Sequence, residues 1–129
     1  MDIDRSPEDV FAYLTDVSNL PSWQSGVHSA ERDGDLIRES RTMLGRRIDN
    51  ELRIVDEEPP RLFTLRALNS PIPFSVRHEL EPNGAGTRLT VIGEGDTGLL
   101  PGFAGKLMAR RAEGQFRKDF ERLKWLLES

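Results

Sequence analysis

Apolar residues recur at helical spacing over the last part of the chain, from Pro101 to Glu128. Spacings of three and four residues place them on one stripe, and charged side chains cover the remaining faces. This pattern predicts a long helix with one broad apolar face, on which the rest of the domain packs. The stripe consists of Ala104, Leu107 or Met108, Ala112, Phe116, Phe120, Leu123 and Leu127.

Between Val27 and Glu94 the apolar positions alternate instead, which is typical of strands with one buried face. The connections are short and rich in Gly, Pro, Asn and Asp, whereas a parallel crossover needs roughly a dozen residues or more. The middle of the chain is therefore predicted to be an antiparallel meander. Its strands are expected at residues 27–32, 36–44, 46–56, 61–67, 74–81 and 87–94.

Two short helices are predicted before the meander. Ser6 can cap a helix that begins at Pro7, with acidic residues at the positive end of its dipole. A second short helix or turn is expected over Asn19–Trp23, and Met1–Arg5 fits the end of a short strand. This order of elements predicts an α+β fold in a single domain, residues 1–129.

Alternation along each strand predicts which side chains face the long helix. One face is aliphatic and aromatic with a single histidine, and the other carries charged residues and threonine. A sheet with one dry and one wet face is covered on one side only. The residues expected on the dry face are Ile48, Leu52, Ile54, Phe63, Leu65, Ala67, Phe74, Val76, His78, Leu80, Leu89, Val91 and Gly93.

Composition narrows the classes of function. The chain has 18 basic and 22 acidic residues, which weighs against nucleic acid as a partner, and it has no cysteine for disulfide or thiolate chemistry. Its apolar runs fall short of the roughly 20 residues that span a membrane. We expect a cytoplasmic protein without a cofactor or an integral membrane segment. The sequence leaves the oligomeric state open, a homodimer included.

Several short segments follow a recognisable order: Ser6–Phe11, Leu14–Asp16, Leu20–Trp23, Glu58–Arg61, Gly86–Thr90 and Leu123–Lys124. Together they span nearly the whole chain and resemble the START-like (SRPBCC) superfamily of helix-grip domains, most closely its polyketide cyclase/dehydrase-like branch. The resemblance implies a curved sheet of about six to seven strands wrapped around the C-terminal helix. It also implies an apolar cavity between them for a hydrophobic or aromatic small molecule, lipid or polyketide-like.

The face assignment and the resemblance together select the residues expected to line that cavity. Trp23 and Phe74 are expected near its mouth. The alternative interpretation of these side chains is that they fill a core. The candidates are Trp23, Met43, Leu52, Phe63, Leu65, Phe74, Val76, His78, Val91, Leu107, Met108, Ala112 and Phe116.

His78 is the candidate with chemistry of its own. Near neutral pH its imidazole can act as a general acid or base, or it can orient a carbonyl or hydroxyl group of a ligand. A core histidine bonded to another side chain or to water is the simpler alternative. Glu39 and Arg41 are further polar candidates, but their strand is polar on both faces, so the sequence does not fix which side they face.

The remaining motifs are weaker. Gly93–Gly98 matches G-x-G-x-x-G, but the parallel strand that a dinucleotide site needs does not follow. Two histidines without cysteine are too few for a zinc site, and no G-x-S-x-G nucleophile motif occurs. The predicted long helix is basic enough to attract an anionic membrane or an acidic partner, although a solvated face with helical ion pairs is simpler.

Three functions are compatible with these observations. The first is binding of a hydrophobic or aromatic small molecule in the cavity. The second is a polyketide cyclase/dehydrase-type enzyme that uses His78 as its acid-base group and no metal. The third is a non-catalytic interaction module that uses the basic face of the long helix.

Overall fold

The computed structural model describes residues 1–43, 45–68, 73–95 and 102–129, with the backbone alone at 43, 102–109 and 112. The described strands agree with the predicted ones to within one or two residues at each end. The elements in chain order are β1 (Asp2–Ile3), α1 (Pro7–Thr15), a 3-10 turn (Val17–Asn19), α2 (Leu20–Trp23), β2 (Val27–Asp33), β3 (Leu36–Met43), β4 (Arg46–Glu58), β5 (Leu62–Ala67), β6 (Phe74–Asn83), β7 (Gly86–Gly95) and α3 (Gly102–Glu128).

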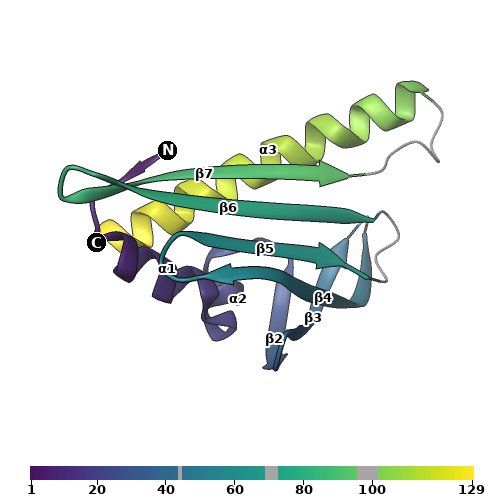
Figure 1. Cartoon of the computed structure of the whole chain (residues 1–129). Coiled ribbons are helices and arrows are strands. Elements are labelled where there is room, and N and C mark those ends of the chain that lie inside the picture. The colour runs from purple at the N-terminus through teal and green to yellow at the C-terminus, as the bar shows by residue number, and fades with distance from the viewer. Residues whose placement is uncertain (44, 69–72, 96–101) are drawn as a thin grey trace.

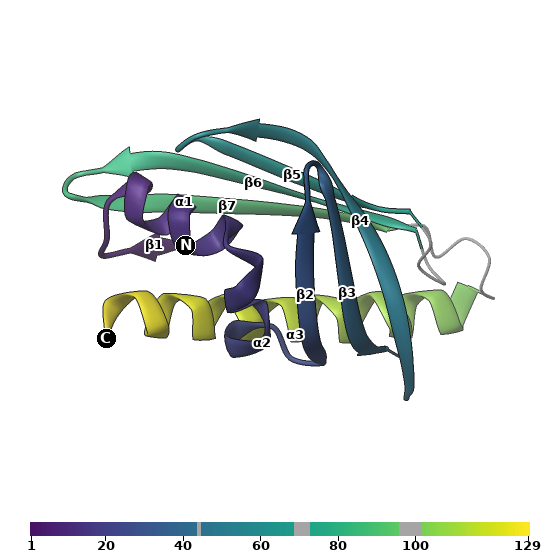
Figure 2. The same ribbon diagram turned by 90° about the horizontal axis from the view of Figure 1, so that it is seen from below.

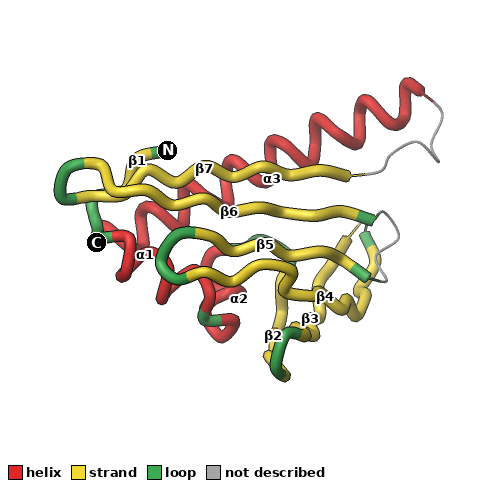
Figure 3. The backbone as a smooth tube through the Cα atoms, viewed as in Figure 1, coloured by secondary structure: helices red, strands yellow, loops and turns green. Residues whose placement is uncertain are grey.

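Within the described part of the chain, the strands form one seven-stranded antiparallel sheet in the order β1-β7-β6-β5-β4-β3-β2. Strands β2 to β7 pair with their neighbours in sequence, and β1 adds to the edge at β7 (Figure 3). The register of β4 on β5 shifts between Ile54 and Asp56, and such a bulge increases the local bend and twist. Figure 2 shows the result: β5 to β7 lie above α3, whereas β2 to β4 run down beside it.

The helices all lie on the concave side of this sheet (Figures 1 and 2). Helix α1 starts as the sequence predicts, because the Ser6 hydroxyl accepts a hydrogen bond from the Asp9 amide at 3.2 Å and Pro7 occupies the first turn. Helix α3 runs beneath the whole length of the sheet. The predicted helix-grip architecture, a curved sheet around a long C-terminal helix, is therefore confirmed.

The interior has a closed end, where α1, β1 and residues 120–128 of α3 meet. Val10, Phe120, Leu123 and Leu127 belong to one buried cluster there. The Arg5 guanidinium donates a hydrogen bond to the Leu127 carbonyl at 2.9 Å, which ties the start of the chain to the end of α3. Burial of these apolar side chains is the main stabilising contribution at this end.

Candidate functional site

Burial of the interior-facing side chains decreases away from the closed end. Along β7 the residues that face α3 pass from buried Leu89 to half-buried Val91 and exposed Gly93. Along α3 they pass from buried Phe120 to half-buried Phe116. We call the region around the last residues of β5 and β7 and the first residues of β6 the open end. Its apolar surface faces the helix without being fully covered.

The predicted cavity-lining residues divide along the same gradient. Trp23, Leu52, Phe63, Val76 and His78 are buried, and Leu65, Phe74, Val91 and Phe116 are half-buried. The alternation therefore assigned the faces of β5 to β7 correctly. The side chains of Met43, Leu107, Met108 and Ala112 lie outside the described residues, so their placement stays a prediction.

Aromatic rings form a continuous path from the open end into the core. Phe116 stacks on Phe120, with centroids 6.0 Å apart and planes at 9°. Phe120 then contacts both Trp23, at 5.1 Å, and His78, at 5.8 Å between centroids. Trp23 is only 2% exposed, so it lies in the core and not at the expected cavity mouth. Phe116 is thus the half-buried member of this aromatic path, and Trp23, Phe120 and His78 are its buried members.

His78 is held in one orientation by the backbone. Its Nδ1 lies 2.8 Å from the carbonyl oxygen of Phe63, and because a carbonyl only accepts, Nδ1 carries the proton. Burial lowers the pKa of His78 from 6.5 to about 4, against the smaller opposing effect of the Phe63 bond. The imidazole is therefore neutral at pH 7. With the proton on Nδ1, Nε2 is the acceptor nitrogen of the ring.

A buried polar cluster lies on the wall formed by β3 and β4. The Glu39 side chain is completely buried and pairs with Arg41, whose Nη2 donates to Glu39 Oε2 at 3.0 Å. Asn50 Nδ2 donates to Glu39 Oε1 at 3.3 Å, and Arg41 Nη2 also donates to Gln24 Oε1 at 3.0 Å. We refer to Glu39, Arg41 and Asn50 as the wall cluster.

The sequence contained only part of the signal for this cluster. Glu39 and Arg41 were candidates whose direction was undecided, and both turn inward, on the parity of buried Ile37. Asn50 was missed, although it alternates with Ile48 and Leu52 on the predicted dry face. A polar residue inside an otherwise apolar alternation is the pattern that would have identified it.

Two further depressions are lined by described residues. One, of about 310 Å³, lies between α2 and α3 and includes Trp23, Lys118 and Asp119. Burial raises the pKa of Asp119, although hydrogen bonds from the Ser25 amide and from Gln115 and the charge of Arg41 act against it. The Ser25 bond, 3.1 Å long, fastens the segment after α2 to α3.

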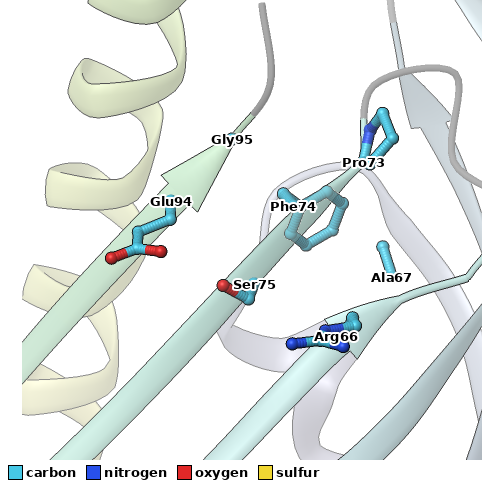
Figure 4. A pocket seen from close by; sticks show the side chains of 7 residues that line it. All are labelled: Arg66, Ala67, Pro73, Phe74, Ser75, Glu94 and Gly95. Carbon is cyan, nitrogen blue, oxygen red and sulfur yellow. The ribbon is translucent and has the colours of Figure 1, made fainter.

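The other depression, of about 440 Å³, lies at the open end (Figure 4). Arg66, Ser75 and Glu94 stand side by side across β5, β6 and β7, because Arg66 pairs with Ser75 and Ser75 with Glu94. Phe74, expected near the cavity mouth, is among its lining residues, with Ala67, Pro73 and Gly95. This depression therefore lies at the same end of the sheet at which Phe74 and Val91 are only half-buried.

The other motifs add no site of their own. Gly93 and Gly95 end strand β7, and residues 96–98 of the glycine motif lie outside the described residues. No cluster of three or more His, Cys, Asp or Glu side chains able to hold a metal occurs among the described residues. In the same part of the chain, no helix is long and apolar enough to cross a membrane.

Comparison with known proteins identifies the relatives of this chain. The family described as "Polyketide cyclase / dehydrase and lipid transport" matches residues 1–128, almost the full length. The chain belongs to this family. This match confirms the resemblance that the short sequence segments indicated. A search of curated proteins found no match to this chain.

Solved structures of the same shape confirm the fold. A conserved protein from Geobacillus kaustophilus superposes with a TM-score of 0.81 at 18% identity, covering 98% of this chain and 91% of its own. A protein from Deinococcus radiodurans gives 0.75 at 21% identity, with 99% and 93% coverage. The di-domain ARO/CYC StfQ from the steffimycin biosynthetic pathway gives 0.77 at 14% identity, and the match covers 99% of this chain and 48% of StfQ. At such identities the likeness establishes the fold and not the chemistry.

Proposed function

We propose that this single domain, residues 1–129, binds a hydrophobic or aromatic small molecule between α3 and the concave face of the sheet, at the open end. The observation that carries the proposal is the gradient of burial. Val91, Phe74 and Phe116 face the interior and yet are only half-buried. Incompletely covered apolar surface on concave walls is what a hydrophobic ligand site offers.

Family membership supports the same function, since the family description combines cyclase and dehydrase members with lipid transport. The closed end supplies the stability that such a site needs. With Leu123 and Val10 fully buried there, the walls of the open end can hold their shape without a filled core between them.

Two adjacent residues on β7 provide a sharp test. Val91 faces the interior, whereas Ile92 points to the outer face and is 41% exposed. Val91→Trp should fill the site and abolish binding of the neutral fluorophore N-phenyl-1-naphthylamine, measured by fluorescence titration. Ile92→Trp is the matched control and should bind as the parent does. Equal binding by all three proteins, or no binding by the parent, would overturn the proposal.

An enzyme of the cyclase or dehydrase type is the second candidate, favoured by the buried neutral imidazole of His78, whose Nε2 is an acceptor. With a pKa of about 4 this imidazole can accept a proton or a hydrogen bond, but on the order of one molecule in a thousand carries the extra proton at pH 7. Acid catalysis by His78 is therefore disfavoured relative to base catalysis. Mass spectrometry of a ligand recovered after long incubation with the protein distinguishes the two candidates. An enzyme would have converted the ligand to a product of different mass or structure, whereas a binding protein would leave it unchanged.

A further inference from the structure

The wall cluster contains a buried acceptor without a donor. Asn50 is 1% exposed, and its Oδ1 has no hydrogen-bond partner among the described residues. Leaving such a group unpaired is unfavourable, so buried side-chain acceptors are generally satisfied by protein, water or ligand. Because Asn50 lies on the concave face of β4, a missing donor has to come from the interior.

The orientation of the Asn50 amide is fixed by its neighbours. The ionised carboxylate of Glu39 can only accept, so the amide must turn its NH₂ group toward Glu39 and its carbonyl away. Arg41 Nη2 donates to Glu39 Oε2 at 3.0 Å, and Arg41 Nε lies 2.5 Å from Oε1 in the same ion pair without making a hydrogen bond. Gln24, at the end of α2, anchors Arg41 in turn.

Stability alone does not require this arrangement. A buried ion pair is often no more stabilising than well-packed apolar residues of similar volume. The wall cluster therefore needs a reason beyond stability, and fixing the direction of one free acceptor is what its geometry achieves.

We propose that Asn50 Oδ1 accepts a hydrogen bond from a hydroxyl group of the bound hydrophobic molecule, so that the site selects alcohols and phenols over ethers and ketones. The inference rests on the proposed function, because it needs a ligand in the interior. Ethers and ketones present only acceptors, which leave Asn50 Oδ1 unpaired and dehydrated. A neutral hydrogen bond of this kind is worth about fivefold in affinity.

A matched pair of probes tests the selection. We would titrate the whole protein with 2-naphthol and with 2-methoxynaphthalene by isothermal calorimetry and take the ratio of the two dissociation constants. Asn50→Leu, which keeps the size of the side chain, should reduce the preference for 2-naphthol by about fivefold relative to the parent. Asn83→Leu, at an exposed asparagine that ends β6, should leave the ratio unchanged.

The outcomes separate the two proposals. If neither probe binds the parent, both the proposed function and the hydroxyl selection fail. If both bind and Asn50→Leu leaves the ratio unchanged, only the hydroxyl selection fails, and water is the partner of Asn50. Should Asn50→Leu not fold by circular dichroism, Glu39→Gln replaces it: the neutral amide no longer dictates how Asn50 turns, so the preference should fall, and an unchanged ratio overturns the inference.

Discussion

Phe116 and Phe120 stack one helical turn apart on α3, yet only Phe120 is buried, at 7% exposure, while Phe116 is half-buried. The pair marks the boundary between the part of the interior that holds the fold together and the part that remains available to a ligand. Two residues of the same type on the same face of one helix should therefore have separable roles.

The first prediction uses this pair. Phe120→Ala should destabilise the protein by about 3–5 kcal/mol, because it leaves a cavity in the core beside Trp23 and His78. Phe116→Ala should cost only about 1–2 kcal/mol but should weaken binding of N-phenyl-1-naphthylamine. Urea unfolding and fluorescence titration measure the two effects. Similar losses of stability in both variants would contradict the division of the interior.

The second prediction concerns pH. The folded-state pKa of His78, about 4, lies below the ordinary value of 6.5, so the unfolded chain binds a proton between these values that the folded protein does not. Stability should therefore be complete above pH 6.5 and should fall as the pH decreases toward 4, by at most about 1.4 kcal/mol per pH unit from this group.

His78→Phe isolates that contribution, because it keeps an aromatic ring and removes the titration. The difference in unfolding free energy between parent and variant should be constant above pH 6.5 and should shift in favour of the variant below it. Carboxylates titrate in both proteins and cancel in the difference. A difference that does not change with pH would mean that His78 keeps an ordinary pKa.

The third prediction concerns the wall cluster. Arg41→Met leaves the buried carboxylate of Glu39 without its cation and should cost about 3–5 kcal/mol. The double variant Glu39→Leu/Arg41→Met removes both charges and should recover most of that loss. A double-mutant cycle from urea unfolding gives the coupling. If the two single losses simply add, the ion pair is not a unit and the orientation argument for Asn50 loses its support.

The fourth prediction contrasts two glycines. A Cβ at Gly86 would lie 2.6 Å from the carbonyl oxygen of Ile3, so Gly86→Ala should weaken the pairing of β1 with β7 and destabilise the protein. A Cβ at Gly114, in the exposed part of α3, meets nothing within 4 Å, so Gly114→Ala should stabilise by up to about 1 kcal/mol. Thermal unfolding distinguishes the signs, and a stabilising Gly86→Ala would show that β1 tolerates displacement.

The fold was predictable because its periodicities are clean. Alternation from Phe63 to Ala67 and from Phe74 to Leu80 identified the dry face, and the Ser6-Pro7 start placed α1. The apolar stripe at helical spacing through Phe116, Phe120 and Leu123 predicted α3, the helix that the sheet encloses. These signals are local, so one sequence is enough to read them.

The wall cluster was not fully predictable, because its inward direction depends on tertiary placement. Glu39 and Arg41 lie on a strand that is polar on both faces, and the burial of Glu39 with Ile37 and its pairing with buried Asn50 show which face is interior. The depressed pKa of His78 likewise follows from the enclosure by Phe63 and Phe120, which no spacing in the sequence reveals.

The bond from Arg5 to Leu127 joins residues 122 positions apart, and this separation bears on how the molecule assembles. Hairpins between neighbouring strands close short loops, whereas the closed end has to bring the two extremities of the domain together. We expect the meander to form before α1, β1 and α3 complete the closed end. A ligand added during refolding from urea would then find the interior not yet covered by α3. The rate at which the ligand binds should therefore be higher during refolding than with the folded protein.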